Sequence, residues 1–186
     1  MAQFNFDKAK ALHASLYVLN RIGKADYHKV FKILYFAEQE HLKKYARPIT
    51  GDEYQAMQFG PVPSYIYDIF KAVDKKYHPF INPEEFIPYF SVTHYANKPY
   101  VEALKKEDTD ELSVSDIEAL DKSLVENKSL SFKQLVKKSH DEAWKGVAKS
   151  EDIEMPYFDI AKAGGASKKM LHYIKIVSEN ATAKLA

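Results

Sequence analysis

The sequence predicts a mainly α fold (α+β): a single compact helical domain with a small antiparallel β-sheet or hairpin. Apolar residues recur at helical spacing through most of the chain, and only two short stretches have a strand-like pattern. The 186 residues are 46% hydrophobic and 13% aromatic, which is enough to bury a sizeable core. We therefore expect one folded domain and no long disordered segment.

Two helices open the chain. The first, over 7–22, has its apolar residues at helical spacing, and Gly23 follows where a left-handed C-terminal cap is favoured. The second, over 26–45, begins at Asp26, a favourable N-cap residue. Because residues 30–37 are apolar almost all round, this helix is predicted to be central and covered on most sides.

Strand-like patterns follow the second helix. Residues 54–59 predict a short strand, and Gly60-Pro61-Val62-Pro63 predicts the sharp turn that closes it. A helix over 64–73 comes next, followed by an irregular loop rich in proline and aromatic residues. A hairpin is then expected from two short strands, over 90–94 and 100–104.

Three capping-box patterns punctuate the second half of the chain. They pair a serine with an acid or glutamine three residues later: Ser115 with Glu118, Ser131 with Gln134, and Ser139 with Glu142. We therefore predict three short helices in succession. After Gly164-Gly165, a closing segment over 170–177 again has helical spacing.

Composition excludes several classes of protein. With 27 basic and 26 acidic side chains, the net charge of +1 lacks the footprint of a nucleic-acid or anionic-membrane binder. Without cysteine there is no disulfide framework, thiolate zinc site, iron–sulfur cluster or cysteine nucleophile. The first residues do not resemble a signal peptide, and no apolar run approaches the ~20 residues of a membrane span. A soluble cytoplasmic protein is expected.

The sequence contains no standard catalytic or cofactor motif. Ser139-His140-Asp141 is the most suggestive triplet, but neighbours on a helix point about 100° apart and cannot form one relay. His140 is interpreted as a first-turn residue, with a hydrolase that uses it as the minor alternative. Glu38, Glu40 and His41 lack the further ligands of a metal site. We therefore expect no catalytic residue, no metal and no cofactor.

Aromatic residues are abundant, with 13 Tyr, 11 Phe and one Trp. Two interpretations stay open: a protein-binding surface, because tyrosine gives large contact area at small entropic cost, or a tyrosine-rich shell over a small core. The tyrosines in question lie in predicted loops and at helix ends: Tyr65, Tyr67, Tyr77, Tyr89, Tyr95 and Tyr100.

Three segments together resemble a known family. They are residues 34–49 of the central helix and its end, Ala56–Val62 followed by Ile66-Tyr67, and Leu135 followed by Ser139–Trp144. Their order and spacing resemble the Panacea domain, the SocA-like antitoxin family also called phage-associated GepA-like proteins. The resemblance covers about residues 8–160. It implies a domain over 1–160, with 161–186 as a C-terminal helical extension packed on it or trailing from it.

The resemblance implies an antitoxin of a bacterial or prophage toxin–antitoxin system. Such a protein neutralises a cognate toxin, encoded by an adjacent gene, by chaperone-like occlusion or as an adaptor to a protease. The toxin-binding or family-motif candidates are Tyr35, Phe36, Gly60, Pro61, Val62, Tyr67, His140, Glu142 and Trp144. A DNA-binding regulator with a winged-helix-like arrangement is the alternative.

Two features depart from the family pattern. Ala46 stands where the family usually has glycine, so a different turn geometry is possible at the end of the central helix. Many members also carry an N-terminal DNA-binding domain, whereas this chain starts a few residues before its first helix. Together with the neutral charge, this makes nucleic acid an unexpected partner.

Overall fold

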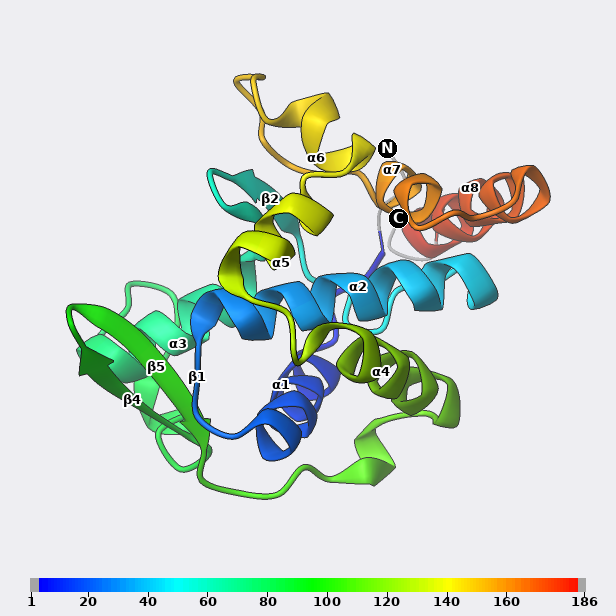
Figure 1. Cartoon of the computed structure of the whole chain (residues 1–186). Coiled ribbons are helices and arrows are strands. Elements are labelled where there is room, and N and C mark those ends of the chain that lie inside the picture. Colours follow the sequence, from blue (N-terminus) through cyan, green and yellow to red (C-terminus); the bar gives the residue numbers. More distant parts are fainter. Residues whose placement is uncertain (1–3, 184–186) are drawn as a thin grey trace.

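The computed structural model describes residues 4–183. Its architecture is mainly α with a small antiparallel sheet, as predicted (Figure 1). The helices are α1 (Lys8–Ile22), α2 (Tyr27–Tyr45), α3 (Ser64–Lys75), α4 (Val114–Asn127), α5 (Phe132–Ser139), α6 (Glu142–Val147), α7 (Tyr157–Ala163) and α8 (Lys168–Ala183). The strands are β1 (Ala25–Asp26), β2 (Tyr54–Met57), β3 (Gly60–Pro63), β4 (Phe90–Tyr95) and β5 (Lys98–Ala103), with short 3-10 turns at Pro83–Glu85 and Thr109–Glu111.

Helix α2 is the central element, as its sequence predicted. Every residue from Val30 to Leu42 is buried, because α1 and α4 pack on one side and α5, α7 and β3 on the other (Figure 1). The Asp26 carboxylate accepts a hydrogen bond from the Lys29 N–H at 2.8 Å, which confirms the predicted N-cap. At the other end Ala46 has φ 58° and ψ 17°, the left-handed conformation that glycine adopts most easily.

The predicted hairpin over residues 90–104 is confirmed. Strands β4 and β5 pair from Phe90↔Ala103 to Tyr95↔Lys98, and β1 adds to the other edge of β5. Ala96 and Asn97 both have positive φ, as a two-residue hairpin turn requires.

The predicted turn at Gly60–Pro63 is wrong, because these residues form strand β3 and pair with β2. The turn lies one step earlier, at Gln58 and Phe59. Two prolines are tolerated in β3 because they lie opposite Tyr54 and Ala56, whose backbone groups point away from β3. The Ala56 N–H donates to Ile153 O, and Tyr54 O accepts from the Met155 N–H, both at 2.8 Å.

One of the three predicted capping boxes is confirmed, at Ser131 and Gln134. The first lies two residues earlier than predicted, at Ser113 with Asp116. There the buried Leu112 precedes the cap and joins the same apolar cluster as Ile117, as in a hydrophobic staple. The third is absent: Ser139 is the buried last residue of α5, and Asp141 caps α6 by accepting from the Trp144 N–H at 3.1 Å.

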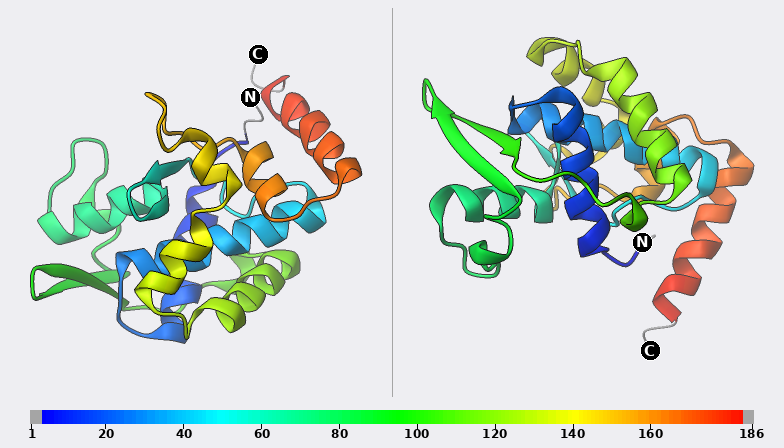
Figure 2. Two further views of the ribbon diagram at one scale, coloured as in Figure 1. Left: turned by 45° about the horizontal axis from the view of Figure 1, so that its top comes forward. Right: turned by 90° about the horizontal axis from the view of Figure 1, so that it is seen from below.

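Buried side chains form two apolar clusters on either side of α2. The first joins α1, α3, α4 and the three-stranded sheet, and the second joins β2, α5, α6, α7 and α8. Helix α8 lies along one edge of the molecule, far from the β4–β5 hairpin (Figure 2). None of the helices within residues 4–183 is both long and apolar enough to cross a membrane.

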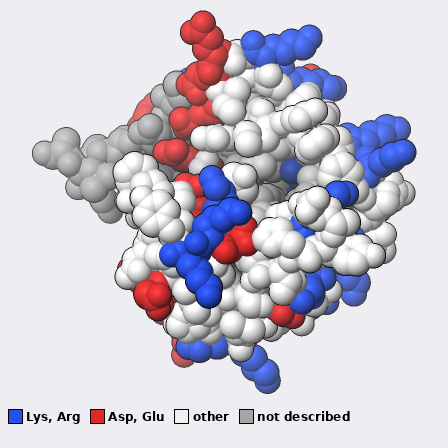
Figure 3. All heavy atoms as spheres, turned by 90° about the vertical axis from the view of Figure 1, so that its left-hand side faces the viewer, with Lys and Arg blue, Asp and Glu red and all other residues white. Residues whose placement is uncertain are grey.

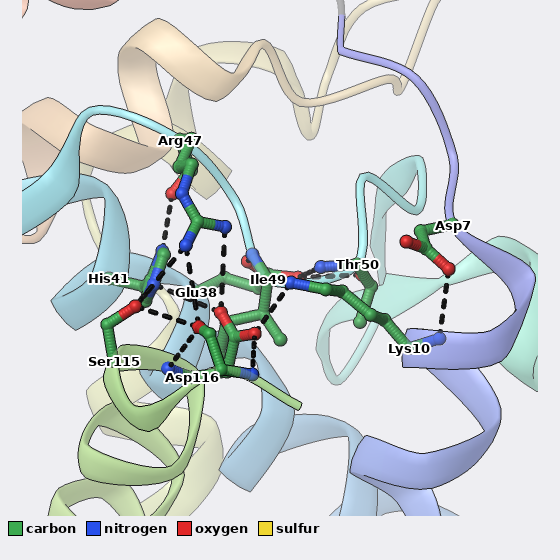
Figure 4. Close-up of polar contacts among 10 residues, drawn as sticks. Asp7, Lys10, Glu38, His41, Arg47, Ile49, Thr50, Ser115 and Asp116 are labelled. Carbon is green, nitrogen blue, oxygen red and sulfur yellow. Dashed lines mark hydrogen bonds and ion pairs between the residues drawn. The ribbon is translucent and has the colours of Figure 1, made fainter. Parts of the chain in front are cut away.

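A polar network ties α1, α2 and α4 together beside the first cluster (Figure 4). The buried Asp116 carboxylate accepts from Lys10 Nζ at 2.6 Å, and His41 Nε2 lies 3.1 Å from it. Burial opposes ionisation of Asp116, but these hydrogen bonds and that of Ser113 outweigh it and hold its pKa well below the usual range. Nearby, the Glu38 carboxylate accepts from the N–H and hydroxyl of Thr50 and so holds the chain after α2.

Candidate functional site

Three segments that are distant in the sequence meet beside α2: the β2–β3 hairpin, the α5–α6 corner and α2 itself. Tyr35 on α2 donates its hydroxyl proton to Asp141 Oδ2 at 2.9 Å, and Gln39 Nε2 donates to the same oxygen at 2.8 Å. Since Asp141 also caps α6, this one carboxylate fixes the α5–α6 corner to the central helix.

The corner in turn holds the hairpin. Trp144 donates its indole N–H to Met57 O at 2.9 Å, and the His140 ring stacks on the indole with centroids 3.6 Å apart. Burial lowers the pKa of His140, and the nearby Lys32 ammonium lowers it further, so the ring is neutral near pH 7. The Asp141 carboxylate thus binds Tyr35, Gln39 and the α6 backbone, and Ser139 Oγ donates to Val136 O.

Gly60 is the point where the hairpin approaches α2 and α5 most closely. Its φ is 102°, and a Cβ there would lie 2.4 Å from Ser139 Oγ and 2.7 Å from Lys32 Cε. Only glycine both adopts this positive φ readily and leaves the space that a Cβ would occupy free. Beside it, Lys32 is fully buried and donates from Nζ to Pro61 O at 2.8 Å.

Lys32 is the functional candidate that sequence reasoning missed. Burial lowers the pKa of its amine to about 7. The signal was present in the sequence, since Lys32 is the only charged residue between Val30 and Ala37. A lysine inside an otherwise apolar stretch of helix draws attention to the position, although only the structure shows that the side chain is buried.

The tip of the hairpin, by contrast, faces solvent. Met57 is 38% exposed and Phe59 is 51% exposed, and the ring of Phe59 packs edge-on against the exposed Phe132 of α5 at 5.5 Å. His28 on α2 supports this tip by donating from Nε2 to Phe59 O at 3.1 Å. Burial lowers the pKa of His28 to about 4, so the imidazole is neutral near pH 7.

A groove of about 300 Å³ runs beside the tip. It is lined mostly by apolar side chains from α2, the hairpin and α3, with Lys32 beneath: Phe31, Lys32, Met57, Phe59, Val62 and Tyr67. Figure 3 shows the side of the molecule toward which the hairpins and α3 point in Figure 1. Uncharged residues cover much of this side, and both basic and acidic groups lie around and among them.

The residues nominated from sequence occupy different positions in this arrangement. Tyr35, Phe36, Gly60 and Pro61 are buried, whereas the half-buried Val62 and Tyr67 line the groove. His140 and Trp144 are half-buried at the corner. Glu142 is exposed and pairs with Lys145 at 2.8 Å. Of the six tyrosines considered for a contact surface, Tyr77 and Tyr95 are exposed and the other four are half-buried.

The acids and histidine considered as metal ligands bind protein groups instead. Glu38 holds Thr50, His41 contacts Ser115 and the Arg47 carbonyl, and Glu40 pairs with Lys43, Lys44 and Lys122. Within residues 4–183 no group of three His, Asp or Glu side chains is placed to hold a metal ion.

These features define a mainly α domain in which α2 and the α5–α6 corner contact a hairpin whose tip is exposed and apolar. The chain belongs to the antitoxin SocA-like family, Panacea domain, whose sequence model matches residues 30–145. The matched region contains most of α2, the β2–β3 hairpin and the α5–α6 corner. No curated protein and no solved structure gives a significant match. Membership supports an antitoxin role and implies a toxin partner.

Proposed function

We propose that this protein is an antitoxin that neutralises a cognate toxin by direct contact, and that the β2–β3 hairpin face is the contact surface. The proposal rests on one observation: most residues of the family motifs bind other residues of this protein. Tyr35, Asp141, Trp144 and Gly60 make contacts within the protein, and together they hold Met57 and Phe59 at the surface.

A rigid apolar projection is well suited to protein binding. Exposed Phe and Met side chains form energetic anchors at interfaces, and a surface that is ordered before binding avoids the entropic cost of ordering it. The proposed role is non-enzymatic, which family membership and the internal contacts of Ser139 and Asp141 support. Occlusion of the toxin and its delivery to a protease both start with this contact.

Co-expression tests the proposal. The product of the neighbouring open reading frame should stop growth when expressed alone, whereas the pair should grow and co-purify. Phe59→Ala should weaken the complex by about tenfold or more, because it removes an exposed anchor without disturbing the core. Tyr173→Ala is the matched control, since Tyr173 on α8 is 54% exposed and lies at the far edge of the molecule.

Four results would separate the alternatives. A harmless neighbour, or rescue of growth without any association, would contradict direct neutralisation. Rescue with loss of the toxin only in protease-proficient cells would identify the adaptor mechanism. Equal effects of Phe59→Ala and Tyr173→Ala would place the contact surface elsewhere.

A further inference from the structure

The groove beside the hairpin combines an apolar lining with an incompletely paired cation. Among its lining residues Lys32 is the only one with a formal charge, and none is acidic. In the part of the chain that the structure describes, Pro61 O is the acceptor for Lys32 Nζ, and no carboxylate lies within 4 Å of it. An ammonium can donate three hydrogen bonds, and among the described residues Pro61 O accepts the one that Lys32 makes. Because Lys32 is fully buried, a ligand reaches its other two donors only by displacing the side chains that cover it.

The wall formed by α3 adds to the positive character of the groove. Lys71 Nζ lies 5.0 Å from the centre of the Tyr67 ring, and Tyr67 lines the groove. No ion pair joins Lys71 to an acid of residues 4–183. Asp26, at the start of α2, is the acid whose charge acts on Lys32, and it caps the helix through the Lys29 N–H.

We propose that this groove binds an acidic, apolar segment of the toxin: a bulky apolar side chain fills it, and a neighbouring carboxylate pairs with Lys32. This inference rests on the proposed antitoxin function for the identity of the partner. A buried cation without a counter-ion is unfavourable, and a carboxylate brought in by a partner relieves that cost with charge-assisted hydrogen bonds. The apolar walls favour the side chain that accompanies it.

Charge complementarity favours an acidic segment over a basic or a purely apolar one in this groove. A basic segment would bring a second cation to an unpaired one, and a purely apolar segment would leave Lys32 buried without a partner. The bound side chain would contact Phe59 and Met57 at the rim, which are the same residues that the contact surface presents.

The test uses small probes in place of the toxin and follows the NMR signals of Met57, Gly60 and Val62 at about pH 6. The probes are 3-phenylpropionate, 3-phenylpropan-1-ol and 3-phenylpropylamine, which share a ring and differ in charge. We expect all shifts to map to the groove, with the carboxylate binding about fivefold or more tightly than the alcohol, and the amine more weakly than either. Equal affinities, a preference for the amine, or shifts elsewhere would overturn the inference.

Two variants identify the groups responsible. Lys32→Met should abolish the advantage of the carboxylate over the alcohol while leaving the alcohol bound, and Phe59→Ala should weaken all three probes. Lys145→Met, on the exposed face of α6, is the control for loss of a lysine. If Lys32→Met does not fold, the comparison of the three probes on the native protein still decides the question.

The probes also separate this inference from the antitoxin role. If the neighbouring gene product is harmless, the probe affinities still show whether the groove selects an acidic apolar group. If the probes show no selection while the toxin complex forms and depends on Phe59, the antitoxin role stands and the chemistry assigned to the groove is wrong.

Discussion

Lys32 illustrates how a single residue can oppose the stability of the fold that contains it. Its ammonium is fully buried, and a single backbone carbonyl accepts its hydrogen bond. Removing a charge from water without a counter-ion is costly, and the amine responds with a pKa lowered to about 7. The apolar residues of 30–37 predicted a central helix covered on most sides, but they could not show that the Lys32 side chain would stay inside, because long side chains usually reach solvent.

The pH dependence of stability measures this cost. In the unfolded chain Lys32 titrates near 10.5, so below about pH 7 both states bind the proton and the folded state bears the full penalty. Between pH 7 and 10.5 the folded state releases the proton first, and the penalty fades as pH rises. We therefore expect Lys32→Met to be more stable than the native protein at pH 6–7, with the difference shrinking at up to about 1.4 kcal/mol per pH unit above that.

Urea unfolding of both proteins from pH 6 to 10 provides the measurement. Titrating groups on which Lys32 does not act, including the buried Asp52 with its pKa raised by burial to about 7, contribute equally to both proteins and cancel in the difference. The Lys32 charge does lower the pKa of His28 and His140, so the comparison above pH 7, where both imidazoles are neutral, carries the result. A stability difference that stays constant over this range would show that Lys32 keeps the same protonation in both states.

At the scale of elements, the sequence predicted most helices and one hairpin, because their periodicity and caps are local. It failed at β3 and at the α5–α6 corner for non-local reasons. Strand β3 pairs with one edge of β2, and residues 153–155, about 100 positions further on, take the hydrogen bonds on the other edge. Ser139 and Glu142 fit the capping pattern as well as Ser131 and Gln134 do. The N-cap of α6 is Asp141 and not Ser139, and the hydrogen bonds of Asp141 with Tyr35 and Gln39, which fix it against α2, are not apparent from the local sequence.

The two candidate caps of α6 can be told apart by mutation. Asp141→Ala removes the cap and leaves the buried Tyr35 hydroxyl without its acceptor, so we expect a loss of about 2–4 kcal/mol. Ser139→Ala should cost less than about 1 kcal/mol, because Ser139 Oγ bonds Val136 O within its own helix. Chemical denaturation of both variants gives the comparison. A larger loss for Ser139→Ala would restore the cap inferred from sequence.

At the scale of the whole molecule, the candidate site depends on contacts between residues about 100 positions apart. Tyr35 meets Asp141, and Met57 meets Trp144. The sequence could nominate these residues as motifs through the family resemblance, but local patterns could not show that they act as internal supports. The exposure of Phe59 and the groove beside it could not be predicted from local patterns, because both depend on how α2, α3, α5 and the hairpin pack together.

Helix α8 lies beyond the region matched by the family model. We propose that it is an integral part of the domain and not a trailing extension, because Ile174 is fully buried in the second apolar cluster with Met170 and Leu171 packed beside it. Ending the chain at Ala166 should therefore lower the free energy of unfolding by roughly 3–5 kcal/mol and the melting temperature by about 10 °C.

The hairpin should survive this truncation, since Trp144 and Lys32 hold it from residues that remain. We expect 3-phenylpropionate to bind the truncated chain as it binds the full one. Ile174→Ala and Ile176→Ala form a matched pair, one fully buried and the other 41% exposed. The first should cost about 2–5 kcal/mol and the second less than about 0.5. Equal melting temperatures for the full and truncated chains would show that α8 only trails the domain. Loss of probe binding on truncation would show that the second cluster also sets the shape of the groove.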